Sequence, residues 1–97
     1  MATYISLINY TDQGIRSIKE SPKRVDAARE LVKKMGGELR QLYLTMGAYD
    51  LIAVVEAPSD DVMASFSLAL GSAGNVRTTT LKAFPEADYR RIVAALS

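Results

Sequence analysis

The stretch that decides the fold is residues 47–58, which read Gly-Ala-Tyr-Asp-Leu-Ile-Ala-Val-Val-Glu-Ala-Pro. Five consecutive apolar residues, 51–55, lie between Gly47 on one side and Pro58 on the other. A short apolar run between such residues is typical of a strand that is buried on both faces. We therefore expect residues 51–55 to form a central strand of a sheet.

Two carboxylates, Asp50 and Glu56, flank this run, and strand alternation places them on one face. At about 3.3 Å per residue they lie about 20 Å apart, which is too far for both to act on one bond. Either they face a ligand, or they are structural. In the structural interpretation, Asp50 orders the adjacent turn through backbone N–H groups, and Glu56 pairs with a basic residue such as Arg77 or Lys82.

Further strands and helices surround this centre. Alternating and β-branched runs predict strands at residues 4–10, 38–46 and 76–84. Apolar residues at helical spacing predict helices at residues 21–35, 59–70 and 86–96. Ser21 and Ser59 are the expected N-caps of the first two, Pro22 the first residue after the Ser21 cap, and Gly36-Gly37 the end of the first. Thr11 or Asp12 would cap a short helical turn.

This order of elements predicts one α+β domain over residues 1–97. It matches the ferredoxin-like βαββαβ fold, a four-stranded antiparallel sheet with both crossover helices on one face, followed by a C-terminal helix. The other face of the sheet must then meet solvent, the C-terminal helix or a partner.

Strand alternation divides the sheet into two faces. We expect the helix side to carry the aliphatic set Ile5, Leu7, Leu42, Leu44, Leu51, Ala53, Val55 and Leu81. We expect the open side to carry Tyr4, Ser6, Ile8, Tyr10, Gln41, Tyr43, Thr45, Asp50, Ile52, Val54, Glu56, Thr78 and Thr80. The open set is too apolar for a wet surface and too polar for a dry core. It predicts a face buried against a second copy, as in a dimeric α/β barrel, with a ligand in the cavity between the sheets.

The candidate ligand-binding residues combine aromatic hydroxyls, threonines and charges. They are Tyr4, Tyr10, Tyr43, Thr45, Asp50, Glu56, Arg77 and Thr80. Tyr43 together with Tyr4 or Tyr10 would line a cavity as hydroxyl donors on an aromatic wall, although packing in a core or interface explains the tyrosines equally well. Arg77 would hold an anionic ligand, or is simply solvated or ion-paired.

Composition excludes several function classes. The net charge of +1 argues against a nucleic-acid or membrane partner recognised by charge alone. The chain has no cysteine and no histidine, so it lacks the usual ligands of zinc, copper and haem, and we expect no metal or cofactor. The N-terminus lacks the pattern of a signal peptide, and no apolar run reaches membrane-spanning length. We expect a cytoplasmic protein.

Residues 43–60, with Gly47, Tyr49 and Asp50 in order, closely resemble the bacterial GYD-domain family, named for its glycine, tyrosine and aspartate. Residues 74–84 are similar to its second block, and residues 11–14 with 21–24 to its N-terminal one. Ser59 departs slightly from the family pattern, in which aspartate is expected at this position. The resemblance implies the fold of the dimeric α/β-barrel superfamily and no particular biochemical activity.

A weaker likeness connects residues 47–51 and 75–80 to the effector-binding domain of leucine-responsive, AsnC-type regulators. That resemblance implies a small-molecule site between subunits. The first predicted strand begins at about Tyr4, so no helix-turn-helix precedes the domain in this sequence and DNA binding is not expected.

Three hypotheses follow. The first is a homo-oligomeric, small-ligand-binding protein. The second is a cofactor-independent enzyme, an oxygenase or isomerase acting on a small aromatic or carbonyl compound through Tyr43 and a carboxylate. The third is a purely structural assembly module.

Overall fold

The predicted central strand forms, and the sheet is built around it. A computed structural model describes residues 1–97. The strand β3 (Leu51–Ala57) pairs with β2 (Glu38–Leu44) on one side and with β1 (Ala2–Tyr10) on the other. The last strand, β4 (Val76–Ala83), pairs with β1, so the strand order is β2-β3-β1-β4 and every pairing is antiparallel. The predicted ferredoxin-like α+β fold is confirmed.

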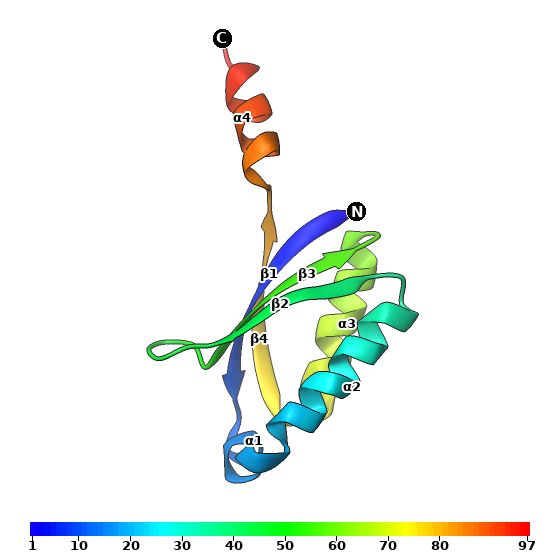
Figure 1. Cartoon of the computed structure of the whole chain (residues 1–97), viewed down its shortest axis with the longest axis vertical. Helices are drawn as coiled ribbons and strands as arrows, with labels where there is room; N and C mark the ends of the chain where they lie inside the picture. The colour runs from blue at the N-terminus through cyan, green and yellow to red at the C-terminus, as the bar shows by residue number, and fades with distance from the viewer.

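Two long helices, α2 (Ser21–Lys34) and α3 (Asp60–Ser72), cover one face of this sheet (Figure 1). Ser59 caps α3 as predicted, because its side chain accepts a hydrogen bond from the Val62 N–H. Thr11 likewise caps the short helix α1 (Asp12–Arg16). The helix α2 ends where Gly36 takes a left-handed conformation, with φ of 90°.

The start of α2 differs from the prediction. A 3-10 turn, η1 (Ile18–Glu20), leads directly into it, so Ser21 is the first helical residue instead of the N-cap, and Pro22 follows it. Ser21 is buried, and its hydroxyl is used in a hydrogen bond with Tyr10 at 2.8 Å instead of capping the helix.

The predicted faces are correct for β2 and β3. Leu51, Ala53 and Val55 are buried under the helices, while Ile52 and Val54 lie on the opposite face. They are wrong for β1, because its register places Tyr4, Ser6 and Ile8 directly opposite Val55, Ala53 and Leu51. Residues directly opposite in adjacent strands point to the same face, so the helix face also receives Tyr4, Ser6, Ile8 and Tyr10.

The same correction applies to β4, whose Thr78 and Thr80 lie opposite Ile8 and Ser6 and therefore face the helices. Ile5, Leu7 and Leu81, predicted under the helices, lie on the open face. Alternation alone could not decide this, because both faces of β1 are largely apolar. Ser6 and Ala53 line a cavity beneath the helices together with Phe66.

The C-terminal helix α4 (Glu86–Ala94) does not cover the open face. It continues beyond the end of β4 and projects away from the sheet and from the other helices (Figure 1). Its apolar residues Tyr89, Ile92 and Val93 are all exposed. The chain is accordingly elongated, with principal extents of 52 × 31 × 18 Å. No helix is both long and apolar enough to span a bilayer.

Candidate functional site

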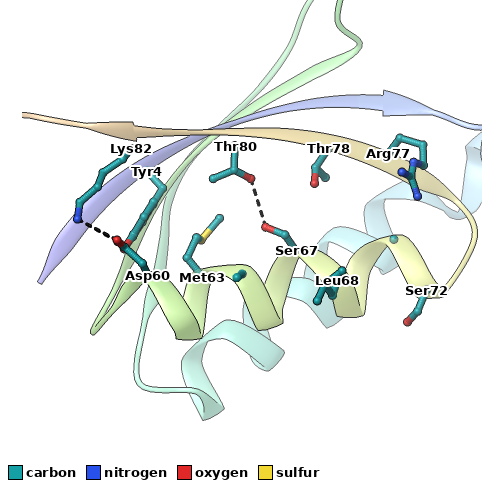
Figure 2. Close-up of a pocket in the computed structure, with 12 residues that line it drawn as sticks. Tyr4, Asp60, Met63, Ser67, Leu68, Ser72, Arg77, Thr78, Thr80 and Lys82 are labelled. Atoms are coloured by element: carbon teal, nitrogen blue, oxygen red, sulfur yellow. Dashed lines mark hydrogen bonds and ion pairs between the residues drawn. The ribbon is translucent and has the colours of Figure 1, made fainter.

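One concave site is a groove between α3 and the edge strand β4, here called the α3–β4 groove (Figure 2). Its volume is about 730 Å³, within the range of ligand pockets. One wall of the groove is formed by side chains of β4 that point toward α3, and the other wall is formed by side chains of α3. Tyr4 reaches the groove from the neighbouring strand β1.

One end of the groove is closed by a three-residue polar cluster. The hydroxyl of Tyr4, a residue that is 3% exposed, donates a hydrogen bond of 2.5 Å to Asp60 Oδ1. Lys82 Nζ lies 3.0 Å from Asp60 Oδ1 and 3.2 Å from Asp60 Oδ2. Asp60 belongs to the first turn of α3, where the helix dipole favours a carboxylate. The cluster ties β1, β4 and α3 together.

The pKa values in this cluster move in opposite directions. The hydrogen bond to Asp60, reinforced by burial and by the carboxylate charge, raises the pKa of Tyr4 to about 12. The hydrogen bonds from Tyr4 and from Lys82 lower the pKa of Asp60. Tyr4 therefore remains a neutral hydroxyl donor at physiological pH and cannot serve as a base or nucleophile.

Farther along the groove the surface changes character. Ser67 Oγ and Thr80 Oγ1 lie 3.2 Å apart and link α3 to β4. Leu68 is 75% exposed. Arg77 lies at the far end, beside Ser72 (Figure 2), and its guanidinium forms no ion pair or hydrogen bond with the rest of the chain. The groove thus offers a pre-formed ion pair at one end, a free cation at the other and an aliphatic surface between them.

A second cavity, of about 280 Å³, lies between α2, α3 and the sheet, and most of its lining is apolar. Tyr10 lines it, and its hydroxyl is bound to Ser21 Oγ. Arg24 also lines it but donates to the backbone carbonyls of Gly14 and Ser17, at 3.0 and 3.2 Å. The polar groups of Tyr10, Ser21 and Arg24 are therefore already engaged within the chain.

Two predicted site residues, Tyr43 and Glu56, are on the open face of the sheet. Tyr43 lies opposite Ile52 and is 53% exposed. Glu56 pairs with Arg40, whose Nε is 3.2 Å from Glu56 Oε1. The predicted partners, Arg77 and Lys82, were wrong because both belong to β4, which is separated from β3 by the whole of β1.

Asp50 and Thr45 hold the loop between β2 and β3. Asp50 Oδ2 accepts a hydrogen bond of 2.9 Å from the backbone N–H of Tyr10, which belongs to β1 and not to the adjacent turn that the structural interpretation expected. Thr45 Oγ1 donates to the Tyr49 carbonyl at 2.6 Å. Both side chains therefore have a structural partner within the chain.

The fold thus brings together three of the eight predicted site residues, Tyr4, Arg77 and Thr80, in the α3–β4 groove. Sequence reasoning missed Asp60 and Lys82 as members of this site. Asp60 looked like an ordinary first-turn carboxylate, and nothing in the sequence indicates that Tyr4, 56 residues earlier, reaches it. No cluster of three or more potential metal-ligating side chains is present.

A profile of the GYD domain matches residues 4–93. The chain belongs to the GYD family. A relative from Thermus thermophilus, named glutamine synthetase and cystathionine beta-lyase binding protein, is 37% identical over 89 residues, which cover 91% of this chain and 94% of the relative.

Two solved structures resemble this GYD protein. The crystal structure of TTHA0845 from Thermus thermophilus is 27% identical in sequence and superposes with a TM-score of 0.56. The match covers 87% of this chain and 94% of the TTHA0845 chain. The crystal structure of MtbAldR superposes with a TM-score of 0.66 over 86% of this chain at 18% identity, a likeness that supports the fold alone. The GYD chain spans 51% of the length of MtbAldR.

In this GYD protein, the proposed catalytic pair of Tyr43 and Glu56 does not converge within one chain. Ile52, opposite Tyr43, and Glu56 are four residues apart on β3, a separation of about 13 Å. Glu56 is also held by Arg40.

Proposed function

We propose that this protein is a homo-oligomeric binding protein whose copies associate through the open faces of their sheets. The observation that carries this proposal is the aliphatic character of a face that no element of its own chain covers. The open face contains Ile5, Leu7, Ile52, Val54 and Leu81 from three adjacent strands. Leaving such a contiguous apolar surface in water is unfavourable, and monomeric proteins rarely do so.

The helix α4 supports the same assembly. Its apolar stripe is exposed, although an isolated helix of nine residues is marginal in water. Packing of this stripe against a second copy would give the helix the tertiary support that it lacks within one chain. Phe84, in the connection between β4 and α4, is also exposed, at 58%.

A small-ligand site would form between the facing sheets. Tyr43 presents an aromatic ring and a hydroxyl on this face, and Glu56 with Arg40 presents a charged pair. Two sheets packed face to face are about 10 Å apart, so these side chains would line a narrow, partly polar cavity. Its ligand would be a small molecule with an apolar body and at least one hydrogen-bonding group.

A second candidate function is the binding of another protein. It is favoured by the printed name of the Thermus thermophilus relative, which describes binding to two enzymes and which covers nearly the whole chain. The two candidates are compatible, because the α3–β4 groove lies on the helix side and stays free when the open faces meet.

Sedimentation equilibrium at micromolar concentration tests the assembly. We expect the wild type to be a dimer or larger, and Leu7→Lys or Leu81→Lys to sediment as a folded monomer because each places an ammonium group on the open face. Ser65→Lys, on the exposed side of α3, adds the same charge away from that face and should keep the assembly. A monomeric wild type at this concentration contradicts the proposal.

Thermal denaturation with a panel of small aromatic and carbonyl compounds tests the ligand site. A compound that binds the native assembly raises the melting temperature, and the rise grows with its concentration. We expect this rise in the wild type and in Ser65→Lys, and its loss in the monomeric Leu7→Lys variant. An equal rise in Leu7→Lys would place the ligand away from the subunit interface.

A further inference from the structure

The outer edge of β4 has free hydrogen-bonding groups whose positions can be derived from the register. The backbone N–H of Thr11 donates to the carbonyl of Asn75 at 3.0 Å, in register with the ladder between β1 and β4. Hydrogen-bonded and non-hydrogen-bonded pairs alternate along an antiparallel ladder. Arg77, Thr79 and Leu81 therefore bond to β1, whereas the N–H and C=O groups of Thr78 and Thr80 point outward.

The two edges of the sheet differ in how well they are protected. At the other edge, β2 is interrupted by a register shift between Leu39 and Gln41, and the extra residue is the charged Arg40. Bulges and charges are the usual means by which proteins prevent further strand addition. By contrast, β4 pairs with β1 over eight consecutive residues without a shift, and its centre is a run of uncharged threonines.

The same residues that expose their backbone also line the α3–β4 groove. The side chains of Thr78 and Thr80 face α3 and border the space that Leu68 faces from the helix (Figure 2). A strand added outside β4 would place alternate side chains on the helix side of the sheet, next to Leu68. The groove therefore supplies both backbone pairing and a surface for side chains.

We propose that β4 and α3 form a docking site for an extended segment of a protein partner, which adds to the sheet as a fifth strand. The segment has apolar side chains at alternating positions, to cover Leu68, and a carboxylate at the end that meets Arg77. Arg77 selects this charge because it has no acidic partner within the chain, whereas Lys82 at the opposite end is neutralised by Asp60. The proposal rests on the second candidate function and not on the oligomer.

A phage-displayed library of random decapeptides provides the probe. Selected peptides should bind the wild type and lose at least about tenfold in affinity for Thr80→Pro, which removes one outward N–H but no bond to β1. The matched variant Thr80→Val keeps that N–H and should bind within about threefold of the wild type. Circular dichroism verifies that both variants fold.

Side-chain variants test the groove without altering the backbone. Leu68→Asp should abolish binding and leave folding intact because Leu68 is 75% exposed, whereas Ser65→Asp on the same helix should have no effect. Arg77→Gln should weaken the selected peptides, and replacing the peptide carboxylate by an amide should make the wild type and Arg77→Gln equal. In the wild-type complex, hydrogen exchange should slow at Thr78 and Thr80.

Three results would overturn the proposal: no enriched peptide, equal binding of peptides by the wild type and Thr80→Pro, or protection of the outward amides by a second copy in the absence of peptide. In the last case Thr80→Pro would lower the oligomeric state.

Failure of docking is distinguishable from failure of the proposed assembly, since Leu81→Lys should dissociate the oligomer and still bind the peptides. Loss of peptide binding in the folded Leu81→Lys monomer would show that the groove is not an independent site.

Discussion

Replacing Tyr4 with phenylalanine should change the pH dependence of stability in a way that the structure specifies. The Tyr4 hydroxyl donates to Asp60, and this contact is the main reason that the pKa of Tyr4 rises from 10.0 to about 12. In the unfolded chain the hydroxyl loses its proton at about pH 10. The native state therefore binds this proton more tightly than the unfolded state, and its contribution to stability is complete below pH 10 and is lost as pH rises toward 12.

The magnitude follows from the two pKa values. A rise from 10.0 to about 12 corresponds to about 2.7 kcal/mol in the free energy of unfolding, of which about 1.4 kcal/mol is lost by pH 11. These values are upper limits, because the Asp60 side chain is 64% exposed and solvent screens its charge. The stability advantage of the wild type over Tyr4→Phe should therefore shrink by up to these amounts.

Urea denaturation followed by circular dichroism, from pH 3 to pH 11.5, measures this advantage. The other ionisable side chains are the same in both proteins, so their contributions cancel in the difference. At the acid end the sign reverses: the pKa of Asp60 is held below its usual 3.8, so its contribution is present above that pH and is lost as pH falls. The wild type should then lose more stability below pH 4 than Tyr4→Phe. A difference that stays constant at both ends would refute the reasoning.

Two further predictions concern positions where side chain and backbone meet. Gly14→Ala should lower the melting temperature, because a Cβ at this position would lie 1.9 Å from the Asn75 carbonyl oxygen. The control Gly71→Ala, whose Cβ would have its nearest neighbour at 4.0 Å, should leave the melting temperature unchanged or raise it. Equal melting temperatures of the two variants would contradict the close approach at Gly14. Asp50→Ala should lower the free energy of unfolding, measured by urea denaturation, by about 1–3 kcal/mol because the Tyr10 N–H loses its acceptor. Asp50→Asn keeps an acceptor oxygen and should lower this free energy by less. If the two substitutions lower it equally, the hydrogen bond is not the cause.

The local sequence determined the elements and their order. Residues 51–55 form the centre of β3, where alternate residues are buried, because five apolar residues between Gly47 and Pro58 leave few alternatives. Ser59 caps α3 for a reason that is also local, since its oxygen meets an N–H three residues later. From these elements the topology follows, since right-handed crossovers leave little other choice.

The faces of β1 and β4 were decided by tertiary structure. Both faces of β1 carry large apolar residues, so alternation identified the two sets but not which of them meets the helices. In the folded chain Ser6 lies opposite Ala53 on the helix face, and Tyr4 on the same face donates a hydrogen bond to Asp60. Neither relation is visible in a local pattern, because the residues are tens of positions apart in the chain.

The candidate site shows the same division. The sequence indicated that Tyr4, Arg77 and Thr80 carry groups suitable for binding, since hydroxyl and guanidinium chemistry belongs to the residue type. It placed Tyr4 and Thr80 on the wrong face, and it could not supply Asp60, because a contact between a strand and a distant helix exists only after the chain has folded. Composition and local pattern fix what each segment can form, whereas register and packing decide which side chains meet, because these depend on contacts between residues far apart in sequence.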